Sequence, residues 1–347
     1  MDDKNISSQE TLKDRMNYYR SRNEQIIPKN SYVLIMLDGK NFSKMIKRKY
    51  KLPFDDEFIN LMNDTAAYVC SKVQGARFAY VQSDEISIFM SDADSEKSTL
   101  FYDGRLVKLL SIIPAIATSY FNRHVLDAKL KDPSLTADEI RKLALEEPLY
   151  QFDAKVWTVP SLKEVLNWIL YRQNDCKRNS KGQAAQTYFP HKALINKNAD
   201  EQIQMLKEEK GIDWNTDYDD GKKFGRFIRK EMEPRITEVN GKTINFERSV
   251  WKTYYAKDLT KPESRDWAME NLIEAQKFED NKTAAKETFD MLQQDTAIYC
   301  DKILKNISYM SSISETFSDC VSVEKENQLD EHYITIEKIK NEIINGQ

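Results

Sequence analysis

The sequence predicts an α+β protein built on an antiparallel sheet of the ferredoxin type, with the order β-α-β-β-α-β and helices on one face. Short runs rich in strand-forming residues occur at 32–37, 76–82, 86–91 and 152–160. A segment with helical spacing of apolar residues separates the first run from the second, and another separates the third from the fourth. An accessory hairpin and a C-terminal helical extension complete the predicted architecture.

The first half of this pattern contains two strands, a helix and a hairpin. The run "YVLIML" ends in "DGKNF", which predicts a buried strand followed by a turn. In "DDEFINLMNDTAAYVCSKV" the apolar residues recur at helical spacing, and Asp55 and Asp56 suit the start of a helix. The segments "ARFAYVQ" and "ISIFMS" then predict two strands joined at "SDE".

The second half of the pattern predicts a long helix from about Lys97 to Val125. Pro114 is expected to kink this helix. Four apolar residues are expected to share one of its faces: Leu106, Leu109, Leu110 and Ile113. The run "FDAKVWTVP" predicts the fourth strand, which a proline closes.

The remaining segments predict helices and a second hairpin. Ser161 and Glu164 have capping-box spacing before the helical segment "LKEVLNWILYRQNDC". Asn240-Gly241 lies between alternating residues, which is a strong hairpin signal. From about Pro262 onward the pattern is helical and highly charged. These last helices either pack on the body or on another subunit, or form a solvated appendage.

The composition excludes several classes of protein. With 40% hydrophobic and 31% charged residues, the 347-residue chain can build a core and stay soluble. A formal charge of −4 does not indicate a nucleic-acid-binding protein, although a basic face can coexist with an acidic surface elsewhere on the molecule. The polar start and the lack of a long apolar run indicate neither a signal peptide nor a membrane span. We therefore expect a soluble, cytoplasmic protein.

Cysteine and histidine do not suggest a zinc site or a disulfide framework. No CxxC pair occurs, and the histidines are too few and too far apart for a histidine-rich metal site. These residues are Cys70, Cys176, Cys300, Cys320, His124, His191 and His332.

Two acids at strand ends form the main candidate site. In the predicted topology the first strand lies beside the central hairpin, so Asp38 and Asp84 are expected to be spatial neighbours. Magnesium binds through a few carboxylates plus substrate phosphates, and two such ions assist attack and departure in phosphoryl transfer. Gly39 could add a backbone carbonyl, and Glu85 could be a further ligand or point into a salt bridge. The alternative for both motifs is a plain turn.

Basic residues near these acids could bind a triphosphate. Arg105 and Lys108 are three residues apart on the predicted long helix. The others lie near predicted strand ends or crowd the end of the capped helix: Lys40, Lys51, Lys155, Arg172, Lys177 and Arg178. For any single one of them, the alternative is a solvated surface charge.

Several motifs together resemble one enzyme family. The segments "LDGKNFSKM", "QSDEISIF", "FYDGRLVKLLSIIPAIATSYFN", "FDAKVWTVP" and "WILYRQNDCKRNSKGQAAQTYF" have the order and spacing of the tRNA-histidine guanylyltransferase family. The chain is most similar to its guanylyltransferase-like branch, the 3′-to-5′ polymerases that repair tRNA 5′ ends. The resemblance covers about Ser31 to Trp251.

The resemblance implies a palm-like catalytic core with two magnesium ions and a set of functional residues. Asp38 and Asp84 with the Gly39 carbonyl would bind metal, and Glu85 belongs to the same catalytic motif. The implied nucleotide-binding residues are Gly39, Lys40, Asn41, Phe42, Ser83, Arg105 and Lys108. The implied RNA or triphosphate contacts are Lys51, Asp153, Lys155, Arg172, Asp175, Lys177, Arg178 and Asn179.

The implied activity is nucleotide addition at a tRNA 5′ end. ATP or GTP would activate a 5′-monophosphorylated RNA end, and the 3′-hydroxyl of an incoming nucleotide would then attack the activated phosphate. The division implied is a core at 1–160, a region at 161–255 that completes the nucleotide and RNA site, and a C-terminal extension at 256–347. The partners implied are tRNA, nucleoside triphosphates and further copies of the chain in a tetramer or dimer, without a membrane.

Two departures refine this expectation. The segment from Lys177 to Gly182 stands where the guanylyltransferase branch proper has His-Ile-Asn-Asn-Leu-Tyr, which favours template-dependent repair. Leu52 stands where a second lysine is frequent in the family. Two other functions are compatible with part of the pattern, namely a nucleotide cyclase or signalling-nucleotide synthase on the same core, and a non-catalytic RNA-binding protein.

Overall fold

The computed structural model describes residues 11–93, 97–130, 134–239 and 242–274. The described residues belong to one compact unit. The helices predicted after residue 274 and the Asn240-Gly241 turn lie outside the described residues. None of the helices in the described part of the chain combines the length and hydrophobicity of a membrane span.

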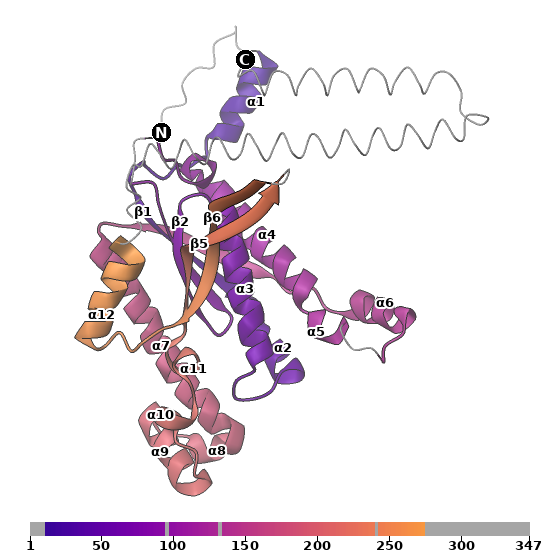
Figure 1. Cartoon of the computed structure of the whole chain (residues 1–347), viewed down its shortest axis with the longest axis vertical. Coiled ribbons are helices and arrows are strands. Elements are labelled where there is room, and N and C mark those ends of the chain that lie inside the picture. Colours follow the sequence, from indigo (N-terminus) through magenta and orange to yellow (C-terminus); the bar gives the residue numbers. More distant parts are fainter. Residues whose placement is uncertain (1–10, 94–96, 131–133, 240–241, 275–347) are drawn as a thin grey trace, which may run out of the picture. The chain divides into compact units, whose positions relative to one another are not determined.

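The elements follow the predicted order (Figure 1). They are α1 (Leu12–Ser21), β1 (Tyr32–Gly39), α2 (Phe42–Lys49), α3 (Asp56–Lys72), β2 (Ala76–Gln82), β3 (Glu85–Ser91), the 3₁₀ turn η1 (Phe101–Gly104), α4 (Leu106–His124), α5 (Asp127–Leu130), α6 (Ala137–Glu146), β4 (Phe152–Val159), α7 (Leu162–Tyr188), α8 (His191–Leu194), α9 (Ala199–Lys210), α10 (Trp214–Asp217), α11 (Asp220–Phe224), β5 (Arg226–Val239), β6 (Lys242–Tyr255), α12 (Pro262–Ala268) and the π-helical η2 (Met269–Glu274).

One antiparallel sheet holds all six strands in the order β4-β1-β3-β2-β5-β6. Its first four strands have the order expected of a ferredoxin-type βαββαβ unit, so the predicted fold class is confirmed. The β5–β6 hairpin is more than an accessory, because β5 pairs with β2 and extends the same sheet.

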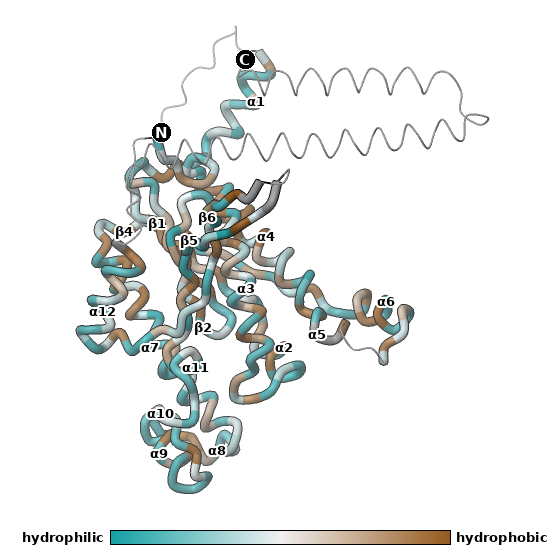
Figure 2. Tube along the Cα trace, viewed as in Figure 1, coloured by the Kyte–Doolittle hydropathy of each residue, from teal (hydrophilic) through white to brown (hydrophobic). Residues whose placement is uncertain are grey.

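Hydrophobic cores lie on both faces of the sheet. On one face Val33, Ile35 and Leu37 of β1 pack with residues of α2, α3 and α4. On the other face Leu34 packs with residues of α7, α12 and η2. The prediction of helices on one face therefore holds only for the βαββαβ unit itself. Burial on both faces explains why β1 is a continuous apolar run. The hydropathy of each residue along the chain is coloured in Figure 2.

One predicted helix start needs correction. The helix expected from Lys97 begins at Leu106, because Tyr102 and Asp103 are in the left-handed region, with φ of 50° and 54°. Pro114 lies inside α4 and is buried, whereas Leu110 is exposed instead of facing the core.

At α7 only half of the predicted capping box forms. Ser161 Oγ accepts a hydrogen bond from the Glu164 amide at 3.3 Å. The Glu164 carboxylate instead accepts one from Asn167 Nδ2 at 3.0 Å.

An aromatic cluster fixes the start of α2 beside the end of β1. The Phe42 ring is fully buried, with ring centroids 5.0 Å from Phe121, 5.0 Å from Phe152 and 5.7 Å from Tyr150. Because α4, β4 and the segment just before β4 contribute these partners, the loop between β1 and α2 is anchored at three places at once.

A largely buried ion pair ties α7 to the sheet. Arg172 Nε donates to Glu85 Oε1 at 2.8 Å, and Nη2 donates to Glu85 Oε2. The exposed fractions of the two side chains are 14% and 10%. Burial alone would lower the pKa of Arg172, but hydrogen bonds and charge from Glu85 and Asp175 raise it above its usual value. This pair fixes the position of α7 over the end of β3.

We expect each single replacement in this pair, Arg172→Met and Glu85→Leu, to lower the free energy of unfolding by about 3 kcal/mol, since each leaves a buried charge without its partner. The double variant should lose at least about 2 kcal/mol less than the sum of the single losses. Urea unfolding measures all four proteins. The exposed pair Lys142 and Glu146, 3.9 Å apart, is the control and should show coupling below about 0.5 kcal/mol. Additive losses in the Arg172 and Glu85 variants would contradict this account.

Candidate active site

The ends of β1, β3 and β4 gather three carboxylates on one face of the sheet. Asp38 lies opposite Glu85 of β3 and opposite Asp153 of β4. The amide of Gly39 donates to the carbonyl of Asp84 at 3.1 Å. The prediction that Asp38 and Asp84 are spatial neighbours is therefore confirmed, and the ladder that holds them is made of backbone hydrogen bonds.

The electrostatics of this cluster favour a cation. Partial burial raises the pKa of Asp38, and the charges of Asp84, Asp153 and Glu85 raise it further, against the opposing charge of Lys155. Burial also raises the pKa of Asp84, although hydrogen bonds from Ser83 and from a backbone amide act in the other direction. A divalent cation between these carboxylates would relieve both desolvation and repulsion.

Asp38 and Asp84 fit magnesium better than a metal that needs a complete protein cage. Within the described residues, no group of three or more His, Cys, Asp or Glu side chains forms a metal-binding cluster. Magnesium needs only one or two carboxylates, because water and substrate phosphates complete its octahedral shell. Asp38, Asp84 and the Gly39 carbonyl would hold it.

Gly39 has a packing explanation that is independent of metal. A Cβ at this position would lie 2.5 to 2.7 Å from atoms of the Phe42 ring. The close approach of that ring therefore requires glycine, and the residue type by itself is no evidence for a metal-bound carbonyl.

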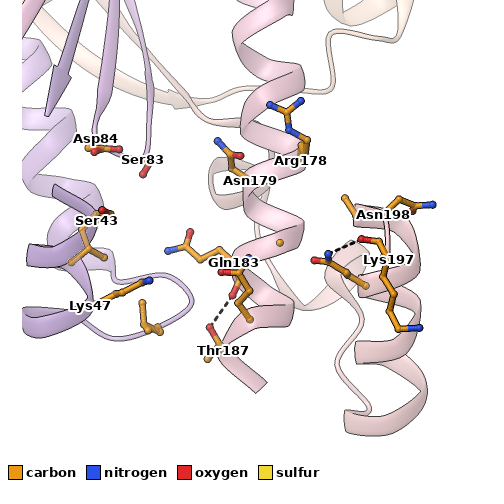
Figure 3. A pocket seen from close by; sticks show the side chains of 16 residues that line it. Ser43, Lys47, Ser83, Asp84, Arg178, Asn179, Gln183, Thr187, Lys197 and Asn198 are labelled. Atoms are coloured by element: carbon orange, nitrogen blue, oxygen red, sulfur yellow. Dashed lines mark hydrogen bonds between the residues drawn. The ribbon is translucent and has the colours of Figure 1, made fainter. Parts of the chain in front are cut away.

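A cavity of about 720 Å³ opens beside the acids. Figure 3 shows Ser83 and Asp84 at the strand ends, with Ser43 and Lys47 of α2 on the same side. The facing wall is α7, and the cavity continues to the start of α9. Side chains of α7 and α9 that line it include Arg178, Asn179, Gln183, Gln186, Thr187 and Gln202. Most of these groups are neutral hydrogen-bonding amides, which suit nucleobases and ribose.

Arg172, Lys177 and Arg178 were expected at the end of a helix, but they lie in the middle of α7, which continues to Tyr188. They and their neighbours divide into two groups. Arg178 and Asn179 line the cavity. Arg172 instead binds Glu85, and Asp175 accepts from Arg172 Nη1 and from Arg178 Nη2, each at 2.6 Å. Lys177 forms an ion pair with Asp258, with Nζ–O distances of 2.9 and 3.0 Å.

Other predicted basic residues are spread around the sheet end. Arg105 caps α4 and pairs with Glu24, and the Lys108 ammonium lies 5.8 Å from the Tyr102 ring centroid. Neither residue lines the cavity beside Asp84. Lys51 lines a smaller cavity that shares Ser83 and Asn179 with the larger one. Lys155 is exposed on β4, opposite Met36.

The residues that follow β1 differ in their exposure to solvent. Lys40 and Asn41 are exposed, and Asn41 is in the left-handed region with φ of 61°. The Phe42 side chain is fully buried, so only its backbone could meet a nucleotide.

Sequence reasoning missed much of the cavity wall. The amides Asn179, Gln183 and Gln186 recur at spacings of four and three residues, so their common face of α7 was detectable. Lys197 and Asn198 carry no such signal, because only the packing of α9 against α7 brings them to this cavity.

Comparison with known proteins gives consistent matches. Residues 13–160 match the family model described as Thg1, tRNAHis guanylyltransferase. The uncharacterized protein R259 of Acanthamoeba polyphaga mimivirus is 29% identical over 236 residues, which cover 64% of this chain and 78% of that protein. The tRNA(His) guanylyltransferase of Schizosaccharomyces pombe is 30% identical, over 48% of this chain and only 58% of that enzyme's length.

A solved structure extends the likeness to three dimensions. The structure described as a bacterial tRNA(His) guanylyltransferase (Thg1)-like protein in complex with ATP superimposes with a TM-score of 0.60 and 28% sequence identity. The match covers 76% of this chain and 99% of the bacterial protein. In both sequence and fold, the chain is therefore similar to the tRNAHis guanylyltransferase family.

Proposed function

We propose that this protein is a magnesium-dependent 3′-to-5′ nucleotidyltransferase that adds nucleotides to a 5′-monophosphorylated tRNA end, most readily in template-dependent repair. The observation that carries the proposal is the meeting of Asp38 and Asp84 beside a large cavity that Asp84 lines. The match of residues 13–160 to the tRNAHis guanylyltransferase family and the ATP bound by the similar bacterial protein support nucleotide transfer as the reaction class.

Each wall of the cavity has a task in this proposal. Asp38, Asp84 and the Gly39 carbonyl hold magnesium, which supplies positive charge to a triphosphate and lowers the pKa of an attacking hydroxyl. Arg178 and Lys47 face the same cavity and would neutralise phosphate charge. The amide row Asn179, Gln183 and Gln186 would orient the nucleotide by hydrogen bonds.

Template-dependent repair is supported by the position of Lys177. This residue replaces the histidine of the dedicated guanylyltransferases, and Asp258 holds its ammonium. Lys177 is also not among the residues that line the cavity. We therefore assign nucleotide choice to pairing with the opposite RNA strand, and not to a side chain at this position.

The decisive experiment uses a tRNA that lacks its first nucleotide and carries a 5′-monophosphate. It is incubated with magnesium, ATP and each nucleoside triphosphate in turn, and extension is read at single-nucleotide resolution. Extension only by the nucleotide that pairs with the opposite strand supports the proposal. A parallel incubation without RNA tests the cyclase alternative, which predicts a cyclic or linked nucleotide product. No extension of any RNA tested would overturn the proposal.

Replacing either acid should abolish nucleotide addition. We expect Asp38→Asn and Asp84→Asn to lower the extension rate by about 10³-fold or more, because several kcal/mol of transition-state stabilisation are lost. Asp266→Asn, at an exposed position of α12, is the matched control and should keep its activity.

Thermal unfolding separates loss of function from loss of fold in these variants. The raised pKa of Asp84 means that its charge costs stability above that pKa. Without magnesium at pH 7, Asp84→Asn should therefore unfold at a temperature at least as high as wild type. The difference in unfolding temperature between this variant and wild type should shrink as pH falls through the pKa that Asp84 has in the folded protein toward its pKa in the unfolded chain. Full activity in either acid variant would refute the assignment.

The magnesium requirement should depend on pH. Since burial raises the pKa of both acids, protons compete with the metal at higher pH than they would for ordinary carboxylates. We expect the half-saturating magnesium concentration to rise as pH falls from about 7 to about 5.5, while saturating magnesium restores much of the rate. Initial rates over a grid of pH and magnesium measure this. A half-saturating concentration that stays constant over the range would contradict it.

A further inference from the structure

Another cavity, separate from the two beside Ser83, lies on the other side of the loop that follows Asp38. It encloses about 470 Å³ and shares no lining residue with the cavity beside Asp84. One wall consists of Lys40, Asn41, Lys44, Met45 and Arg48, and the other is the segment 148–151. Three of these residues are cations and none is a carboxylate. The cavity therefore presents positive charge that no acid in its lining offsets.

The three cations form a row along α2 and the loop before it. Phe42, Met45 and Ile46 are buried, which fixes the orientation of the helix and leaves the remaining face outward. Lys44 and Arg48 are four residues apart on α2, so their positions are about 6 Å apart along the helix, whereas Lys40 lies in the loop just before it. In the described part of the chain Lys40 and Lys44 have no ion pair, and the Arg48 guanidinium contacts only the Tyr150 hydroxyl, at 3.5 Å.

The opposite wall is held in place before any ligand arrives. Asn122 Oδ1 accepts from the Tyr150 amide at 2.8 Å, and Asn122 Nδ2 donates to the Tyr150 carbonyl at 2.7 Å. The Lys40 amide donates to the Gln151 carbonyl at 2.9 Å, which joins the two walls just beyond Asp38.

Glu147, which directly precedes the wall segment 148–151, is already in an ion pair. The Glu147 carboxylate pairs with Lys49 and accepts from the Tyr150 hydroxyl at 2.6 Å. The exposed fractions of the Lys49 and Glu147 side chains are only 10% and 13%. Glu147 therefore supports the wall and leaves the charge of Lys40, Lys44 and Arg48 uncompensated.

We propose that this cavity binds consecutive backbone phosphates of the RNA substrate next to its 5′ end. The inference rests on the proposed function and adds the surface that holds the RNA. Cations spread along a helix and the loop before it suit a chain of phosphates better than one compact triphosphate. Such contacts place the strand without reading its sequence. The hydrogen bond that joins the cavity walls starts two residues after Asp38, so RNA bound here has its end at the acids.

The test compares two double variants with equal loss of charge. K44Q/R48Q removes two cations of the row, whereas K72Q/R123Q removes a lysine and an arginine at exposed positions of α3 and α4. The probe is a 5′-monophosphorylated RNA stem-loop with a fluorophore at its 3′ end. Its Kd is measured by anisotropy over a series of salt concentrations, with magnesium present and without nucleotide.

We expect K44Q/R48Q to raise the Kd about tenfold at 0.1 M salt and to reduce the slope of log Kd against log salt by about 1 for each cation removed. The control variant should match wild type in both quantities. The extension rate at saturating RNA and the KM for nucleotide should stay within about twofold in K44Q/R48Q, since the charge acts on RNA binding.

Two results would overturn the inference. One is an RNA Kd and salt slope in K44Q/R48Q equal to those of the control. The other is a raised KM for nucleotide with unchanged RNA affinity, which would assign the cavity to a triphosphate. Either result can occur while the wild-type protein extends RNA. The inference about the cavity can therefore be wrong while the proposed function is right. Failure of wild type to extend any RNA would instead overturn the proposed function.

Discussion

The backbone pairing of β1 with β3 and β4 is the constraint on which the site depends. It places Asp38 next to Glu85 and Asp153, three carboxylates that repel one another. The apolar residues next to them in the chain oppose this repulsion, because Leu37 and Ile86 are fully buried in the core on the other face. Hydrophobic burial thus holds the acids in an arrangement that they would not adopt alone, as is common where a site requires local strain.

The acids of this cluster have different surroundings and therefore different roles. Glu85 is buried and its charge is met by Arg172, which leaves it poorly placed to bind a metal. Asp38 and Asp84 have no basic partner at hydrogen-bonding distance among the described residues. Of the two alternatives for Glu85, the structure has the salt bridge. Asp175 then links Arg172 to Arg178, so that one row of charges connects β3 to the cavity wall.

Local patterns were sufficient to predict the four strands of the βαββαβ unit and the positions of Asp38 and Asp84 at the ends of its strands. The apolar run of β1, the helical spacing in α3 and the strand pair around Ser83 and Asp84 each reflect burial that is periodic along the chain. Partners from distant segments were not predictable in the same way. Glu24 pairs with Arg105 and Asp258 pairs with Lys177 across 81 residues in each case, and nothing in the local sequence specifies either contact. The late start of α4 depends on left-handed backbone at Tyr102 and Asp103, a conformation that tyrosine adopts rarely and aspartate more often.

The short helix α2 explains how two binding surfaces can serve one pair of acids. It contains no acidic residue, and consecutive positions on a helix point about 100° apart. Ser43 and Lys47 therefore face the cavity beside Asp84, while Lys44 and Arg48 face the cavity on the other side. The loop from β1 to α2 separates the two and directly follows the end of β1, which carries Asp38. A nucleotide in one cavity and an RNA strand in the other would approach the acids from different sides, as in-line displacement at a phosphate requires.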